Sequence, residues 1–384
     1  MCMTVKNIIS VVTIFLCQLS FAQTEKWHNP ENADFPVVQG QAFQGEERGG
    51  FYHRFPARAQ EAVRKAVWNL SKNTAGESIC FSTDSKNIKV RYRVLRRKSM
   101  NHMPATGVSG VDLYTYDKNG KEIWLAPKYA FKDTVTYTYS QIEPLNVTGG
   151  FKKYTLYLPL YNEVDWLEIG VDDGAKFRFE PVPSEKPIVA YGTSICQGAC
   201  ASRPAMAWTS ILQRRLGRTV INLGFSGNCM HESAVVDLVA DVDAAVYILD
   251  GMPNLYRLPA PELQDTIVKA VRQLRGRRPD TPIVLVDHSG YPNALVNKKS
   301  RDDQERSLQC MEAAYQQLVK EGVKSLYRLR YEEIGIEGEM FVEGIHMSDY
   351  GMITYADAYE PLLRKILRKC GIKSSYQKIR GNND

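Results

Sequence analysis

The chain has 384 residues, of which 44% are hydrophobic and 24% are charged. This composition excludes an intrinsically disordered or low-complexity protein, and the length favours about two domains. The formal net charge of +6 is a mild excess, unlike the clustered basic charge of nucleic-acid-binding proteins, so we expect no nucleic-acid partner. It permits an anionic substrate without requiring one.

Residues 1–22 have the pattern of a secretory signal peptide. Lys6 precedes an apolar run over residues 8–16, and Ala22 and the residue two before it are small, as a cleavage site requires. The run is shorter than the roughly 20 residues that span a bilayer, and we expect no transmembrane segment elsewhere. We therefore expect an exported bacterial protein, periplasmic or secreted. The alternatives are an uncleaved anchor or a lipoprotein linked through Cys17.

The region from about 23 to 185 has the sequence pattern expected of an antiparallel β-sandwich of jelly-roll type. Its short apolar stretches alternate with period two, and turn-forming residues separate some of them. The expected strands cover residues 88–94, 135–139, 154–158 and 164–169, with tight turns at 117–120 and 172–174 and one short helix over 56–70.

A different pattern follows the segment 181–187, in which three prolines favour a linker. From 186 to 384, continuous apolar strands alternate with helices, which indicates a parallel sheet covered on both faces. In such sheets ligands bind at the carboxyl ends of the strands. The expected strands are 188–191, 220–223, 244–249 and 282–286, and the expected helices are 207–216, 262–275 and 303–320.

Residues that could act together in one reaction follow these strands. Ser194 follows the first strand near a helix N-terminus, where backbone amides favour the negative charge created by a nucleophilic serine. Gly227 follows the second strand and allows close approach of a backbone N–H, and Asn254 follows the third, where its amide can donate to an oxyanion. His346 comes three residues after Glu343, a carboxylate that can fix the imidazole tautomer able to deprotonate Ser194. Each residue alone has an ordinary structural explanation, so the argument depends on the combination.

With these residues in place, the second half of the chain resembles the SGNH (GDSL) hydrolase family. Segment 192–195 reads Gly-Thr-Ser-Ile where the family has Gly-Asp-Ser-Leu, which puts Ser194 at the nucleophile position. Gly227 and Asn254 fall at the family's oxyanion-hole positions, beside the amide of Ser194, and His346 falls at its general base. The resemblance implies a flavodoxin-like three-layer α/β/α domain that uses no cofactor and no metal.

The first half carries a second resemblance. Segment 110–114 reads Gly-Val-Asp-Leu-Tyr, which is similar to the Gly-x-Asp-Leu-Tyr motif of an N-terminal domain found in a bacterial subgroup of this family. The resemblance therefore extends over both halves, from about residue 30 to 370.

Three positions depart from the family pattern. Thr193 replaces the aspartate before the nucleophile, and segment 252–255 reads Met-Pro-Asn-Leu where the family has Gly-x-Asn-Asp. Glu343 stands where the family has an aspartate, and its extra methylene would place the imidazole of His346 differently. Asp349 could orient His346 instead, or a backbone carbonyl could do so and leave a Ser–His dyad. We expect Glu343 to be the partner.

Other residues are candidates for weaker roles. Arg203, Trp208 and His288 could bind substrate because they follow the nucleophile or the fourth strand, although a core position for Trp208 and a structural role for His288 are the alternatives. The basic and aromatic run 91–98 is either a solvated strand face or a platform for an acidic polysaccharide. No metal-ligand spacing is found, and the disulfide pairing and oligomeric state are not determined by the sequence.

The resemblance implies acyl transfer through a serine nucleophile. For an exported chain with a jelly-roll-like partner domain, we expect a carbohydrate esterase that removes small ester groups, O-acetyl first, from a polysaccharide or oligosaccharide. The alternatives are a methylesterase acting on uronic acids of an acidic, pectin-like polysaccharide, a lipid acetylhydrolase, and a non-catalytic carbohydrate-binding protein with a decayed site.

Overall fold

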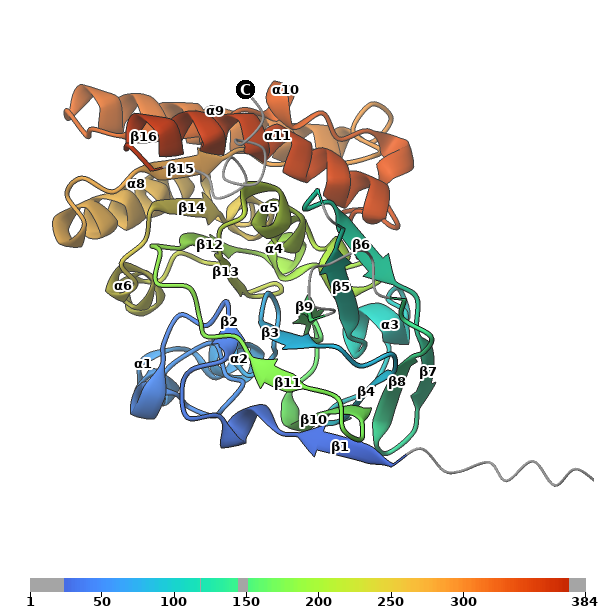
Figure 1. Ribbon diagram of the computed structural model, residues 1–384. Coiled ribbons are helices and arrows are strands. Elements are labelled where there is room, and N and C mark those ends of the chain that lie inside the picture. Colours follow the sequence, from blue (N-terminus) through green and yellow to red (C-terminus); the bar gives the residue numbers. More distant parts are fainter. Residues whose placement is uncertain (1–23, 118, 144–150, 373–384) are drawn as a thin grey trace, which may run out of the picture.

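The computed structural model describes residues 24–117, 119–143 and 151–372 (Figure 1). The expected signal peptide lies outside these residues.

In the N-terminal part, two antiparallel sheets enclose a common core. One sheet has the order β1-β10-β4-β8-β7 and the other the order β11-β3-β9-β5-β6, with β2 paired to β3. The strands of the first sheet are β1 (Glu25–His28), β10 (Val164–Asp172), β4 (Ile88–Val94), β8 (Val135–Tyr139) and β7 (Lys128–Phe131). Those of the second are β11 (Phe177–Phe179), β3 (Ser78–Thr83), β9 (Lys152–Tyr157), β5 (Asp112–Tyr116), β6 (Glu122–Leu125) and β2 (Val38–Gln39).

The alternation of side chains explains why these strands form a sandwich. On β4, Ile88, Val90 and Tyr92 are buried, while the basic residues between them face outward. Successive side chains of a strand point to opposite faces, so this spacing places all three apolar residues in the shared core. The expected β-sandwich is confirmed.

The outward residues of β4 face acidic residues on the neighbouring strand. Arg91 pairs with Glu168, and Arg93 pairs with Asp165. The first part of the basic run 91–98 is therefore an ion-paired strand face, which favours the solvated-face interpretation over an acidic-polysaccharide platform there.

One local expectation holds and one needs correction. The turn at 172–174 forms, with Ala175 N donating to Asp172 O at 3.0 Å, but it connects β10 and β11, which belong to different sheets. The helix expected over 56–70 is two short helices, α1 (Ala59–Ala62) and α2 (Lys65–Ser71). They are separated because the backbone of Val63 is extended, with φ −107° and ψ 162°.

The C-terminal part contains a five-stranded parallel sheet of order β13-β12-β14-β15-β16. This is the flavodoxin-like order, which confirms the expected α/β class. The strands are β12 (Ile188–Gly192), β13 (Val220–Gly224), β14 (Val246–Asp250), β15 (Ile283–Val286) and β16 (Leu326–Leu329). The fifth strand, β16, was not expected, because its two central residues, Tyr327 and Arg328, are polar and only partly buried.

Helices cover both faces of this sheet (Figure 1). Alternate residues of β12 explain the layers, since Ile188 and Ala190 face one helical layer and Val189 and Tyr191 face the other. The first layer contains α5 (Trp208–Leu216) and α11 (Asp349–Lys369), and the second contains α6 (Ser233–Asp241), α8 (Ala260–Arg277) and α9 (Lys298–Lys320). The short helices are α3 (Ala105–Val108), α4 (Ser194–Gln197), α7 (Met252–Leu255) and α10 (Tyr331–Ile334). Within the described residues, no helix combines the length and apolarity needed to span a membrane.

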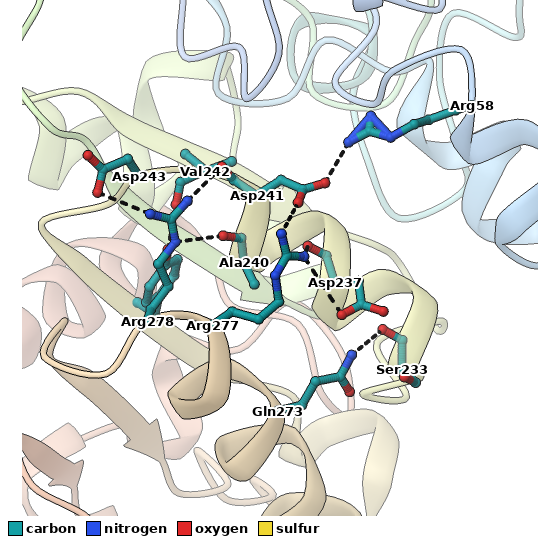
Figure 2. A network of polar contacts seen from close by, with 11 residues as sticks. Arg58, Ser233, Asp237, Ala240, Asp241, Val242, Asp243, Gln273, Arg277 and Arg278 are labelled. Carbon is teal, nitrogen blue, oxygen red and sulfur yellow. Dashed lines mark hydrogen bonds and ion pairs between the residues drawn. The ribbon is translucent and has the colours of Figure 1, made fainter.

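The two parts share a core and polar contacts. Phe55, Val67 and Trp68 of the N-terminal part pack into the same apolar cluster as α6 and α8. At the surface of this junction, Asp241 of α6 accepts from Arg58 of the N-terminal part and from Arg277 of α8 (Figure 2). The segment that contains α1 and α2 is therefore packed against the C-terminal sheet layers as well as against the sandwich.

Candidate active site

Ser194 begins α4 directly after β12. Thr193 caps this short helix, and its side chain accepts a hydrogen bond from Ile195 N at 3.3 Å. Because Ser194 is the first helical residue, its backbone N–H has no acceptor within the helix and is available to another group. The hydroxyl of Tyr161, from the N-terminal part, donates to Ser194 O at 3.2 Å. The serine is 7% exposed and is held from both parts of the chain.

His346 and Glu343 lie in one closed loop before α11. The loop is tied by Val342 N, which donates to His346 O at 2.8 Å. Glu343 Oε1 accepts from the backbone N–H of His346 at 3.0 Å and also contacts His346 Nδ1. His346 Nε2 lies 2.7 Å from Ser194 Oγ. The structure thus brings the three sequence-predicted residues into one hydrogen-bonded chain.

The partners of His346 determine how its ring nitrogens are used. An ionised carboxylate only accepts hydrogen bonds, so Nδ1 carries the proton directed at Glu343. Nε2 then presents its lone pair to the hydroxyl of Ser194, which is the arrangement a general base requires. Burial lowers the pKa of His346 below its ordinary value, Glu343 opposes this by raising it, and His102 lowers it further. The imidazole is consequently neutral and able to accept a proton at neutral pH.

Asp349 has a different partner. Its carboxylate accepts from Ser202 N at 2.8 Å and also from the hydroxyl of Ser202. These contacts attach the start of α11 to the loop that follows α4. In the structure, Glu343 and not Asp349 is the carboxylate hydrogen-bonded to the ring of His346.

The three residues predicted to donate to an oxyanion follow the carboxyl ends of three neighbouring strands. Gly192 of β12 is in register with Gly224 of β13 and with Asp250 of β14, so the segments that follow these strands begin side by side. Gly227 adopts the left-handed region, with φ 68°, in the loop after β13. On α7, Asn254 is buried and its Oδ1 accepts from Cys229 N at 3.0 Å. This fixes the amide and leaves the Nδ2–H groups to donate elsewhere.

Gln197 is a site residue that the sequence pattern did not reveal. Its Oε1 accepts from Ser226 N at 3.0 Å, and its Nε2 donates to Leu160 O at 3.1 Å. It therefore links the helix after Ser194, the loop that contains Gly227 and the N-terminal part. The approach is close, since a Cβ at Gly224 would lie 2.2 Å from Gln197 N. No spacing rule identifies such a residue, because the two hydrogen-bond partners of its side chain, Ser226 and Leu160, come from distant segments.

His102 is a second residue that was missed. It lies on a loop of the N-terminal part, is exposed, and stacks against His346 with ring centroids 5.7 Å apart and an interplanar angle of 21°. The N-terminal part thus forms one wall of the site that contains Ser194. No motif surrounds this histidine in the sequence, and only the packing of the two parts places it beside His346.

Two of the three candidates for substrate binding are fully buried. Trp208 is fully buried, stacked on Tyr359 with ring centroids 4.5 Å apart, which corrects its expected role because it presents no surface to a ligand. His288 is also fully buried; its Nδ1 accepts from Gly290 N at 3.0 Å, and burial lowers its pKa to about 4. A neutral, enclosed imidazole fits a structural role, so this expectation is corrected too.

Arg203 joins the two parts of the chain. Its guanidinium donates to Asp112 at 3.1 Å and to the hydroxyl of Tyr114 at 2.9 Å. Asp112 also accepts from Ala205 N at 2.8 Å. The Gly-x-Asp-Leu-Tyr segment therefore binds the loop after the nucleophile through Asp112 and Tyr114, and the guanidinium of Arg203 is used in these contacts.

Comparisons with known proteins agree with this architecture. Residues 185–364 match the model of the GDSL-like lipase/acylhydrolase family, and residues 25–177 match that of the N-terminus of SGNH-hydrolase-type esterases, GxDLY. The chain is 32% identical to a solved protein of Bacteroides ovatus described as a GDSL-like lipase, with a TM-score of 0.81 over 90% of this chain and 98% of that one. No curated protein matches the sequence.

More distant solved structures share the fold alone. A salicylyl-acyltransferase from a tetracycline biosynthetic pathway is 20% identical, with a TM-score of 0.69 over 91% of this chain and 98% of that one. An acetyl xylan esterase of Butyrivibrio proteoclasticus is 10% identical, with a TM-score of 0.51 over 90% of this chain and 99% of that one. On the strength of both matched regions and the Bacteroides relative, the chain belongs to the GDSL-like (SGNH) lipase/acylhydrolase family, in the form that carries an N-terminal GxDLY domain.

Proposed function

We propose that the protein is a serine carbohydrate esterase that removes small ester groups, O-acetyl first, from an oligosaccharide or polysaccharide. The observation that carries the esterase proposal is the hydrogen-bonded chain from Ser194 Oγ through His346 to Glu343, with 2.7 Å between Ser194 Oγ and His346 Nε2. This is the geometry in which a neutral imidazole removes the proton of an attacking hydroxyl.

The proposed reaction has two half-steps. Ser194 Oγ attacks the ester carbonyl while its proton passes to His346 Nε2, and the carbonyl oxygen becomes an oxyanion. The backbone amides of Ser194 and Gly227 and the side chain of Asn254 stabilise that charge. His346 then gives the proton to the leaving alcohol. Water, deprotonated by the same imidazole, attacks the acyl-serine and releases the acid. Glu343 holds the imidazole and stabilises its charged form throughout.

Three observations support the carbohydrate part of the proposal. The acetyl xylan esterase of Butyrivibrio proteoclasticus shares the two-part fold. The β-sandwich reaches the site, because Tyr161 contacts Ser194 and His102 contacts His346. Residues 1–22 favour export, which would place the enzyme where polysaccharides are found. The proposed organisation is a signal peptide (1–22), an N-terminal β-sandwich domain (23–185) and a hydrolase domain (186–384).

The first experiment measures hydrolysis of p-nitrophenyl acetate by the wild type and by Ser194→Ala. We expect the substitution to abolish turnover, because it removes the attacking oxygen. Equal, slow release by both proteins would reject the enzyme and favour the non-catalytic carbohydrate-binding alternative.

The second experiment identifies the ester. A panel of acetylated and methyl-esterified glycans is scored for acetate and for methanol, with Ser194→Ala as the blank. We expect acetate from the acetylated members. Methanol alone from pectin-like substrates would replace this proposal with the uronic-acid methylesterase, an alternative consistent with the net charge of +6.

A further inference from the structure

A cluster of nitrogen and sulfur ligands lies beside the proposed base. His102, Cys200 and His346 each offer one side-chain atom, and these atoms all lie within 4.8 Å of one another. His102 comes from the N-terminal part, Cys200 from the loop after α4, and His346 from the loop before α11. The mechanism proposed above uses only His346, so the other two need a separate explanation.

The backbone holds two members of the cluster in place. Met100 and Met103 exchange backbone hydrogen bonds of 3.0 and 3.1 Å, which close a tight turn with His102 inside it. Cys200 Sγ donates to His102 O at 3.4 Å, and the backbone of Cys200 is in the left-handed region, with φ 65°. The packing of the two parts therefore places the three residues together.

The chemistry of the donors suits a thiophilic divalent cation. Two imidazole nitrogens and one thiolate are ligands that Zn²⁺ accepts, and three protein ligands leave a fourth position for water. Zn–N and Zn–S bonds of about 2.1 and 2.3 Å need ligand atoms somewhat closer together than 4.8 Å. The exposed ring of His102 can make that adjustment by rotation. Glu343 on His346 Nδ1 adds the carboxylate that commonly stands behind a metal-bound imidazole.

We propose that His102, Cys200 and His346 form an inhibitory site for Zn²⁺ or a similar cation. In the tautomer imposed by Glu343, the only lone pair of His346 is on Nε2, which now faces Ser194 Oγ. Coordination uses that lone pair, so the bound cation and the serine hydroxyl compete for it. The inhibition rests on the proposed esterase function, whereas the binding of the cation does not.

Binding also has a proton balance. Burial, followed by the nearby Glu343 carboxylate, raises the pKa of the Cys200 thiol to about 12. The cation therefore meets a thiol, forms the metal–sulfur bond and releases one proton to the buffer. No oxidant or reductant takes part, and a chelator reverses the step.

The binding test uses Co²⁺ and Zn²⁺ on the full-length Ser194→Ala protein. Titration with Co²⁺ should produce a sulfur-to-metal charge-transfer band, and calorimetry with Zn²⁺ should give one site. Adding Cys200→Ser should remove the band, and adding His102→Gln should weaken Zn²⁺ binding at least tenfold. Adding Cys370→Ser, at an exposed cysteine, is the matched control and should change neither. An unchanged band in the Cys200→Ser protein would overturn the proposal.

The inhibition test follows hydrolysis of p-nitrophenyl acetate, with each protein compared with its own metal-free rate. Wild type and Cys370→Ser should be inhibited by Zn²⁺ and recover with EDTA, while His102→Gln and Cys200→Ser should need at least tenfold more Zn²⁺. Equal sensitivity in all four proteins would reject the site. If the wild type shows no esterase activity, the Co²⁺ and calorimetric results still decide the metal site, so the two proposals fail separately.

Discussion

The guanidinium of Arg54 donates to the main-chain carbonyl of Gly224 at 2.8 Å, so the N-terminal part holds the backbone that leads from β13 into the loop of Gly227. Arg54 is fully buried and also donates to the carbonyls of Leu70, Asn73 and Asn222. Burial lowers its pKa to about 10, which still leaves the side chain charged at neutral pH. One buried cation therefore connects the two parts of the chain at the end of β13, the strand that leads into the proposed oxyanion loop.

We expect Arg54→Met to destabilise the protein by about 3–5 kcal/mol, because the carbonyls it satisfies would lose their donors in a buried environment. The free energy of unfolding, from urea denaturation followed by circular dichroism, measures the effect.

Arg58→Met is the matched control, since Arg58 is half-exposed and pairs with Asp241 at the surface. Exposed ion pairs contribute about 0–1 kcal/mol, so this variant should unfold close to the wild type. A similar decrease in the free energy of unfolding in both variants would contradict the prediction that the buried hydrogen bonds of Arg54 stabilise the protein.

The partner of His346 can be tested by comparing two carboxylates. We expect Glu343→Ala to lower kcat by about 10²–10⁴-fold, because the imidazole would lose the group that fixes its tautomer and stabilises its cation. Asp349→Ala, which breaks contacts with Ser202, should lower kcat by less than about tenfold. Steady-state kinetics on p-nitrophenyl acetate give both values, and the reverse order would reject the assignment of Glu343.

Asn254 should contribute to the transition state and little to the fold. Removing one oxyanion donor costs about 3 kcal/mol, or roughly 100-fold in kcat, so we expect that loss for Asn254→Ala with KM nearly unchanged. Asn254→Asp keeps the acceptor for Cys229 N but replaces the donor by a negative charge, and it should lose at least as much.

Asn228→Ala is the control for this loop, because Asn228 caps a local turn through Ser226 O and has no proposed donor role. A loss in the Asn228 variant equal to that in the Asn254 variants would mean that the effect comes from loop disorder.

The acid limb of the pH profile should respond to the neighbours of His346. The base must be neutral to accept a proton, so kcat/KM falls as pH drops through the pKa of His346. The neighbouring His102 lowers that pKa and Glu343 raises it. His102→Gln should therefore move the acid limb to higher pH, and Glu343→Gln should move it to lower pH. Profiles that shift together, or not at all, would contradict this electrostatic account.

Local patterns in the sequence were sufficient for much of the fold. Period-two alternation in segments such as 88–94 follows from strand geometry, and continuous apolar runs such as 188–191 follow from burial on both faces. The pattern failed where residues were only partly buried. Strand β16, with Tyr327 and Arg328 at its centre, lacks a periodic signal, and nothing local shows that the turn after Asp172 changes sheets.

The sequence by itself determined the residues that carry the proposed chemistry, because Ser194, Gly227, Asn254 and His346 each follow a recognisable strand or motif. Only the tertiary structure decided between Glu343 and Asp349, since both carboxylates lie three residues from His346 and the closed loop alone orients one of them towards the ring. Contacts among Gln197, His102, Cys200 and Arg54 also depend on the packing of the two parts. Such contacts join segments far apart in the chain, so no spacing or periodicity can encode them.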